Sequence, residues 1–264
     1  MAESEQYKEL SRVPRTLSEP YNGDNLDLLI ESGGTIMHDI IIFAANTQMK
    51  DLFGETWFSM EDFCTVMGYE RTKLQRKLTE EQKAKTFGAI KPVYKTEYAG
   101  EQIEHPIETF FESALFSLGK NTLSVAYNVN GATRYKFIPI LESFDIKDNF
   151  GTKKKTKRMY KVNLSKELKN LMFTGYNLID LKDYRNLPNK RSYRKFYLNL
   201  SKMIFLIKHK IQAGQEPEFT MTVDELARHF DINIANNHDR KKKVVTTLNA
   251  INKNLTNEVR IRIC

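Results

Sequence analysis

The sequence predicts an α+β protein in which one order of elements occurs twice: a helix, two helices around a tight turn, and a β-rich run. Three observations support this prediction. Each helix pair opens with a capping signature, strand-type alternation follows each pair, and positive charge concentrates in the second half. At about 150 residues per domain, the chain has room for one large domain or two small ones.

The order of these segments divides the chain into three parts. We expect a flexible N-terminal arm over residues 1–25, which carry two prolines and many polar side chains. A first domain should span 26–174, with an insertion around 79–130 whose role the sequence leaves open. A second domain should span 189–264, after a connector rich in Asn, Asp and Gly.

The composition narrows the functional class. Cys64 and Cys264 are the two cysteines, which excludes a disulfide-rich scaffold and a four-cysteine zinc site. No window approaches 18 consecutive apolar residues, and the N-terminus is too polar for a signal peptide. No glycine-rich nucleotide-binding motif is present. We therefore expect a cytoplasmic protein without membrane contact and without a cofactor.

Charge is distributed unevenly along the chain. Residues 151–264 carry 25 basic and 10 acidic side chains, a net charge of +15, whereas residues 1–150 carry 16 and 23, a net charge of −7. A segment this basic attracts polyanions, because each neutralised phosphate releases a condensed counterion. Nucleic acid is the expected partner, although a soluble protein with a high isoelectric point would show the same excess.

The segment WFSMEDFCTVMGY carries the first capping signature. Ser59 and Asp62 form a capping box, which predicts a helix over Met60–Met67. Gly68 suits the left-handed position after its end. A second helix is expected at once over ERTKLQRKL, residues 70–78, which makes a helix-turn-helix or an ordinary αα-hairpin.

A helical wheel orients that second helix, with Leu74 and Leu78 pointing inward. The residues that point outward, and that we expect to contact DNA, are Thr72, Lys73 and Arg76. Further along, residues 135–146 and 158–165 read as two strands of a hairpin around Gly151. Its basic tip is a second candidate DNA contact, or a solvated loop, and includes Lys153, Lys154 and Lys155.

The second copy begins with a long helix over residues 190–211. A short strand at Phe219–Met221 and a capping box of Thr222 and Glu225 follow, which opens a helix. The last helix, DRKKKVVTTLNAINKNL, should be capped by His238 or Asp239. Its apolar face comprises Val244, Leu248, Ile251 and Leu255.

Opposite that face the wheel places polar and basic side chains that can bond base edges or phosphates. The residues expected to point outward are Lys242, Thr246, Asn249 and Lys253, with Arg240, Lys241 and Lys243 on the first turns. Four consecutive basic residues there oppose the helix dipole at about 0.3–1 kcal/mol each. A nearby phosphate backbone would remove this penalty, whereas a plain solvated face would not.

The chain ends in EVRIRIC, which alternates as a strand and adds Arg260 and Arg262 as candidate DNA contacts. A β-wing needs a second strand, which is absent, so the wing is minimal or the chain is truncated.

The order of these segments resembles that of the iteron-binding plasmid replication initiators, the Rep family with two tandem winged-helix domains. The likeness covers roughly 200 residues and rests on WFSMEDFCTVMGYERTKLQRKL, FTMTVDELARHFDI and DRKKKVVTTLNAINKN, with the pair Ile251-Asn252. It implies a non-enzymatic protein that binds repeated origin sites in double-stranded DNA. It also implies that 240–253 is the major-groove helix, with host replication proteins and a homodimer as further partners.

Two other functions stay open. WFSMEDFCTVMGY also resembles the N-terminal domain of phage-type antirepressors and transcription regulators. A nuclease or relaxase that uses Tyr197 is the third candidate. It is less favoured, because none of the five histidines forms a His-x-His or His-Glu-x-x-His motif. Tyr193 and Tyr197 are better interpreted as core aromatics, Cys64 as an inert core thiol, and Glu61-Asp62 as helix capping.

Overall fold

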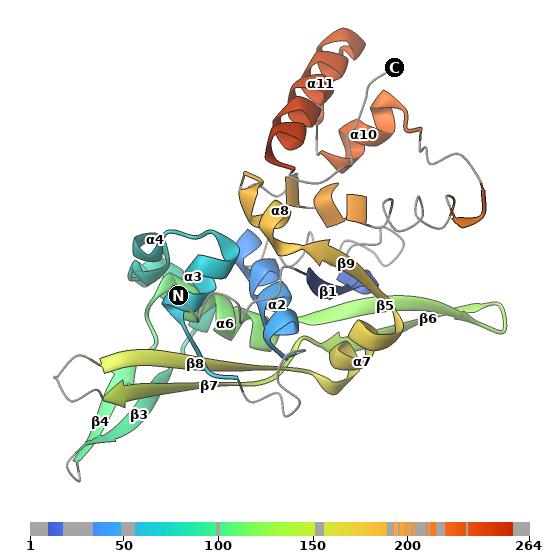
Figure 1. The fold of residues 1–264 in the computed structure, drawn as a ribbon. Coiled ribbons are helices and arrows are strands. Elements are labelled where there is room, and N and C mark those ends of the chain that lie inside the picture. The colour runs from blue at the N-terminus through green and yellow to red at the C-terminus, as the bar shows by residue number, and fades with distance from the viewer. Residues whose placement is uncertain are drawn as a thin grey trace.

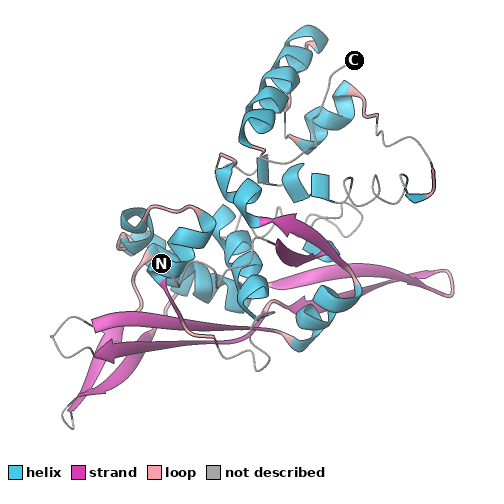
Figure 2. Cartoon of the chain, in the orientation of Figure 1, coloured by secondary structure: helices cyan, strands magenta, loops and turns pink. Residues whose placement is uncertain are grey.

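The computed structural model mixes helices and strands, which confirms the α+β class (Figure 2). The structure describes residues 10–17, 34–48, 56–98, 101–150, 156–188, 193–194, 196–198, 200–201, 203, 210, 212–214, 220–230 and 232–255.

The expected N-terminal arm contains ordered structure. Strand β1 (Leu10–Pro14) pairs antiparallel with β9 (Tyr176–Asp180), and the 3-10 helix η2 (Arg15–Leu17) follows it. Val13 and Leu17 are buried in the core. The prediction of a flexible arm is therefore wrong for residues 10–17, because this stretch supplies one strand of a sheet and two core side chains.

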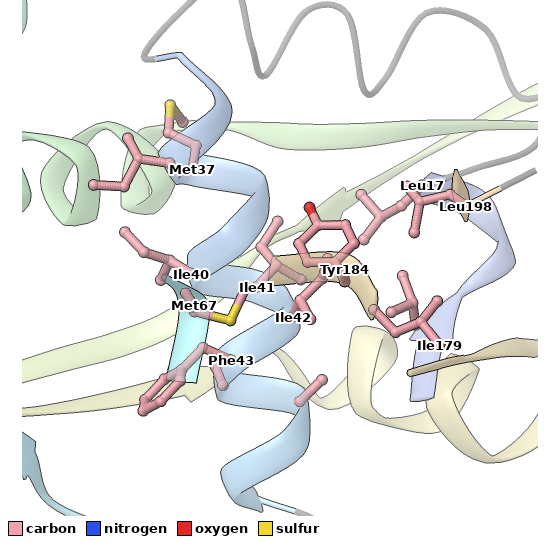
Figure 3. Close-up of a cluster of buried hydrophobic side chains, with 14 of the residues drawn as sticks. Leu17, Met37, Ile40, Ile41, Ile42, Phe43, Met67, Ile179, Tyr184 and Leu198 are labelled. Atoms are coloured by element: carbon pink, nitrogen blue, oxygen red, sulfur yellow. The ribbon is translucent and has the colours of Figure 1, made fainter. Parts of the chain in front are cut away.

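Helix α2 (Thr35–Gln48) is the centre of the core. Its residues from Ile36 to Thr47 are all buried, which is the pattern of a helix surrounded by other elements on every side. Side chains from β9, from helix α8 (Leu181–Asn186) and from Leu198 pack around it (Figure 3).

The first capping box forms as predicted. Strand β2 (Phe58–Ser59) leads into α3 (Met60–Met67), where Ser59 and Asp62 cap each other, and Gly68 has a φ of 74°. The next helix, α4 (Arg71–Gln75), is shorter than expected. Arg76–Leu78 instead run alongside 108–110, with a bridge between Lys77 and Thr109. This pairing takes the backbone amide and carbonyl groups that a longer helix would need.

A further capping box, of Thr79 and Gln82, begins α5 (Glu80–Phe87). The hairpin β3 (Val93–Tyr98) and β4 (Glu101–Pro106) and helix α6 (Phe110–Lys120) follow. Strands β5 (Thr122–Val129) and β6 (Ala132–Pro139) then form a two-stranded sheet with each other.

The predicted hairpin is present as β7 (Leu141–Phe150) and β8 (Thr156–Leu164), and β2 joins it in the order β2-β8-β7. The prediction of one strand over 135–146 is wrong for residues 135–139, because they belong to β6 and pair with β5 instead. An aromatic cluster holds helices against this sheet. Ring centroids lie 4.8 Å apart for Phe43 and Phe58, 5.1 Å for Phe63 and Phe111, and 5.0 Å for Phe111 and Tyr160. The pairs Phe43–Phe58 and Phe111–Tyr160 are edge-to-face, a geometry that adds to the free energy of burying their area.

After β8 come α7 (Lys166–Thr174), β9 and α8. The expected connector therefore contains a strand and a helix. Beyond it, every described residue from 193 to 203 is helical, as predicted for the long helix. Thr220 and Met221 are not in a strand, so the short strand predicted over 219–221 is wrong there, and Phe219 lies outside the described residues.

Helices α10 (Val223–His229) and α11 (Asn237–Asn254) complete the described chain and lie at one end of the molecule (Figure 1). One core cluster includes residues of both predicted domains, from Val13 to Ile251, so the division into domains stays a prediction. Among the described residues no helix is both long and apolar enough to cross a membrane.

Candidate nucleic-acid interface

Helix α11 is positioned by the turn that precedes it. Thr222 and Glu225 form the predicted capping box of α10, and the ring of Phe230 at its end lies 4.6 Å from the ring of Phe196. The cap of α11 is Asn236, whose side chain accepts the amides of His238 and Asp239. The prediction of His238 or Asp239 as the cap is therefore wrong, because the helix begins two residues earlier.

The two faces of α11 divide as the wheel predicted. Val244, Leu248 and Ile251 are each at most 1% exposed, and Leu255 packs against the same core. The opposite residues are all exposed, and they are Lys242, Thr246, Asn249 and Lys253. The buried face fixes the rotation of the helix, so these four side chains point to solvent together.

The basic residues at the start of α11 differ in their surroundings. Arg240 is half-buried and forms an ion pair with Asp224 of α10, with Nε and Oδ1 3.2 Å apart, and it also bonds Asn237. Lys241 and Lys243 are exposed. Arg240 thus joins the two helices, and its guanidinium is already paired within the protein, which the sequence did not predict.

The earlier start of α11 also weakens the dipole argument. Because the helix begins at Asn237, residues 240–243 lie mostly beyond the first turn, where the dipole acts most strongly. Asn236 and Asp239 offset part of what remains. The exposure of the basic face, rather than a dipole penalty, is the stronger indication of a polyanion.

A shallow hollow of about 330 Å³ lies on α11. It is lined by His238, Lys241, Lys242, Val245 and Thr246. The hydroxyl of Thr246 donates to the carbonyl of Lys242, which leaves its oxygen lone pairs as acceptors. The hollow thus offers two ammonium groups, an imidazole and a hydroxyl acceptor around the apolar side chain of Val245. Such a set of groups can contact a phosphate and the edge of a base. The sequence missed His238 as part of this site, although its spacing of three and four from Lys241 and Lys242 places all three on one face.

The first helix pair presents a weaker version of this surface. Thr72, Lys73 and Arg76 are exposed, but Arg76 follows the end of α4 rather than lying on it. Lys73 pairs with Glu70 at 3.0 Å, and the guanidinium of Arg76 lies 6.0 Å from the ring centroid of Phe110. Local partners thus already engage both of these cations.

The β7–β8 hairpin lies at the opposite end of the molecule from α11 (Figure 1). Near its turn end, Lys147 lies over the ring of Trp57, 4.0 Å from the centroid. Arg158 pairs with the buried carboxylate of Glu112 at 2.5 Å and lies over Tyr94. Burial alone would lower the pKa of Arg158, but the charge and hydrogen bond of Glu112, together with Tyr94 and Tyr160, outweigh burial and raise it. Arg158 is therefore a structural cation.

Several predicted contacts lie outside the described residues. They are Lys153, Lys154 and Lys155 at the hairpin tip, and Arg260 and Arg262 in the final segment.

A buried polar cluster that the sequence did not reveal joins the two halves. Asp39 of α2 accepts hydrogen bonds from Tyr184 of α8 and from Tyr69, the latter at 2.5 Å. Arg194 lies 3.8 Å from the same carboxylate and 4.0 Å from the ring centroid of Tyr184. His38 Nδ1 is 3.0 Å from the hydroxyl of Tyr184. Contacts between residues this far apart in sequence leave no periodic signal.

Burial and charge oppose each other in this cluster. Burial alone would raise the pKa of Asp39, but Arg194 and the hydrogen bonds from His38 and Tyr184 together hold it below its usual value. Burial and the Asp39 charge raise the pKa of Tyr69 and of Tyr184, which stay protonated donors. Asp39 and Arg194 therefore form a buried ion pair between the halves.

Tyr197, the side chain considered for catalysis, and the thiol of Cys64 are both buried in the core. Tyr197 is buried and donates to the carbonyl of Asp180 at 3.2 Å, which confirms its interpretation as a core aromatic. Cys64 is a buried free thiol whose pKa burial raises. In the described part of the chain, no three His, Cys, Asp or Glu side chains gather in a way that could hold a metal ion.

Comparison with known proteins adds no relative, because no family model, curated protein or solved structure matches this chain.

Proposed function

We propose that this chain is a sequence-specific binder of double-stranded DNA with two winged-helix units. The observation that carries the proposal is the face of α11 that exposes Lys242, Thr246, Asn249 and Lys253 above a buried apolar face. An α-helix fits the major groove, lysine contacts phosphates and guanine, and asparagine pairs with adenine through two bonds. The α10–turn–α11 arrangement supports α11 as the recognition helix.

The first unit is assembled from separate parts of the chain. Helices α2, α3 and α4 with the sheet β2-β8-β7 supply three helices and a β-hairpin, the parts of a winged helix. The segment 79–139 is then an insertion between the helices and the hairpin. Since α11 and the turn end of β7–β8 lie at opposite ends of the molecule, a duplex that touches both must span it (Figure 1).

Within this class we propose a plasmid replication initiator that binds direct repeats in origin DNA, with host replication proteins and a second copy as partners. This proposal rests on the resemblance of the segment order. A phage-type antirepressor or transcription regulator is the alternative, because the β2–α3–Gly68 segment fits both.

Repeat spacing separates these two functions. The test duplexes carry either one copy of a selected site or two copies as direct repeats. A spacing of about 20 bp places the two copies on the same side of the DNA double helix. An initiator should occupy both direct repeats in a footprint, whereas a regulator should prefer an inverted pair or a single site. A nicking assay on supercoiled DNA with divalent metal tests the relaxase alternative, and we expect no nicked product.

A further inference from the structure

The β5–β6 hairpin projects beyond the elements around it (Figure 1). Its strands pair only with each other among the described residues, from Thr122 opposite Pro139 to Val129 opposite Ala132. Asn130 and Gly131 form the two-residue turn, both with positive φ. A two-stranded hairpin is marginally stable when it packs against nothing else. This hairpin has eight residues per strand and offers little core in which a large apolar side chain could be buried, so such side chains are unusual there.

Large aromatic side chains are nevertheless exposed there. Tyr135 and Phe137 are each 66% exposed, the highest values among the large hydrophobic residues that the structure describes, and Tyr127 is 45% exposed. Side chains alternate along a strand, so Tyr135 and Phe137 share one face of the hairpin. Tyr127 lies on the other face, opposite Arg134 in the register.

The charge of the hairpin is of one sign. Residues 122–139 contain Arg134 and Lys136 and no Asp or Glu, although the half of the chain around them has a net negative charge. Both cations are exposed and alternate with the two rings along β6. Exposed rings interleaved with cations, without carboxylates, suit a ligand that offers flat apolar surfaces and negative charge together.

We propose that the face carrying Tyr135 and Phe137 binds single-stranded nucleic acid by stacking its bases. The two rings lie two residues apart on a strand, about 6.8 Å. This is about twice the 3.4 Å rise per nucleotide of a stacked strand, so an extended single strand can place one base on each ring. The bases of a duplex are already stacked on both sides, and exposing their faces costs a few kcal/mol per step.

The charged side chains supply the remaining contacts. The outer edge of β6 has no strand beside it among the described residues, and Arg134 and Lys136 can reach round that edge to phosphates. This site uses no residue of α11, so it stands whether or not α11 binds duplex DNA.

Fluorescence anisotropy of a labelled 15-mer of deoxythymidine tests the proposal with the full chain. We expect the wild type to bind, and Tyr135→Ala with Phe137→Ala to weaken binding at least tenfold, because each stacked base contributes about 1–3 kcal/mol. The matched control is Tyr127→Ala, on the other face, which should change the affinity by less than about twofold. Both rings are exposed, so the double variant should fold, and its circular dichroism and melting temperature check this.

Two further measurements separate this site from the α11 face. The double variant should retain its affinity for duplex DNA, and substitutions on α11 should leave binding of the 15-mer unchanged. The proposal is overturned if the wild type does not bind the 15-mer or if the double variant binds it equally well. It is also overturned if the double substitution changes only the sedimentation of the protein, since the hairpin would then be a contact between copies.

Discussion

The two helix pairs of this chain begin with the same local signal and present different surfaces. Ser59 with Asp62, and Thr222 with Glu225, form equivalent capping boxes. The helix after the first turn has 5 residues, whereas the helix after the second has 18. A short helix exposes few side chains in a regular array, so the second pair is the better candidate for reading base edges.

The basic residues of the two pairs differ in their partners as well. In the first pair Lys73 contacts Glu70, Arg71 contacts Glu61, and Lys77 contacts Glu108. On α11 an ion pair engages Arg240, while Lys241, Lys242, Lys243 and Lys253 are exposed. The number of cations on a helix is therefore a poor measure of its capacity to contact DNA. A carboxylate of the protein that pairs with a cation competes with phosphate for it, so the carboxylates near a helix matter as much as the number of its cations.

The largest expected effect comes from neutralising Asp39, whose carboxylate pairs with Arg194 and joins the N-terminal half of the chain to the C-terminal half. Asp39→Asn leaves Arg194 buried without its counter-charge, which should lower the free energy of unfolding by about 3–5 kcal/mol. Chemical denaturation followed by circular dichroism measures this. The exposed Asp145→Asn is the matched control and should change stability by less than about 0.5 kcal/mol. Equal stability of both variants would show that the pair does not hold the halves together.

The same variant has a defined pH dependence. The folded-state pKa of Asp39 lies below the ordinary 3.8, so its ionised form stabilises the protein at pH values above that figure. This contribution is lost as the pH falls through the lowered pKa. The stability difference between the wild type and Asp39→Asn should therefore be constant above about pH 5 and shrink in acid. A difference that grows in acid would contradict this assignment.

The next effect compares the two basic surfaces directly. Neutralising Lys241, Lys242 and Lys253 to Gln should weaken duplex binding about 100-fold near 0.15 M salt and reduce the salt slope by about 2–3. The matched variant neutralises Arg71, Lys73 and Arg76 and should reduce the slope by less than about 1. Titrations at several salt concentrations measure both. Equal losses would remove the distinction between the two helix pairs.

Single substitutions sharpen the comparison at the level of base pairs. Lys242→Ala should reduce discrimination at one base pair by about 1–3 kcal/mol, whereas Lys73→Ala should leave sequence preference unchanged. Competition between a selected site and single-base variants of it provides the measurement. A uniform loss across all sequences for Lys242→Ala would assign that lysine to the phosphate backbone.

The smallest effect concerns Arg240. Its pair with Asp224 is partly exposed, so a double-mutant cycle with Arg240→Gln and Asp224→Asn should give a coupling of less than about 1 kcal/mol in unfolding. Arg240→Gln should weaken duplex binding less than Lys241→Gln does, because Arg240 already has a partner in the protein. The opposite order would show that Arg240 leaves Asp224 for the DNA.

Local signals in the sequence predicted the local parts of the structure. The capping boxes, the turn at Gly68 and the two faces of α11 each depend on residues within one or two turns. The pairing of β1 with β9 and the Asp39–Arg194 contact join residues more than 150 positions apart, and no periodicity reports them. The end of α4 also escaped prediction, because pairing with residues 108–110 sets it rather than helix propensity.

The candidate site divides in the same way. The outward position of Lys242, Thr246, Asn249 and Lys253 follows from apolar spacing alone and was predicted. The pairing of Arg240 with α10 and the hollow beside His238 depend on how the helices pack and on where α11 begins, so they required the structure.

Selection of bound sequences from a random duplex library, run in parallel with the wild type and Asn249→Ala, tests the central claim most directly. The account predicts that the wild type enriches one motif and that Asn249→Ala loses the preference for adenine at one position within it. If both proteins enrich the same motif with the same preferences, or if the wild type enriches none, α11 does not read the groove as described.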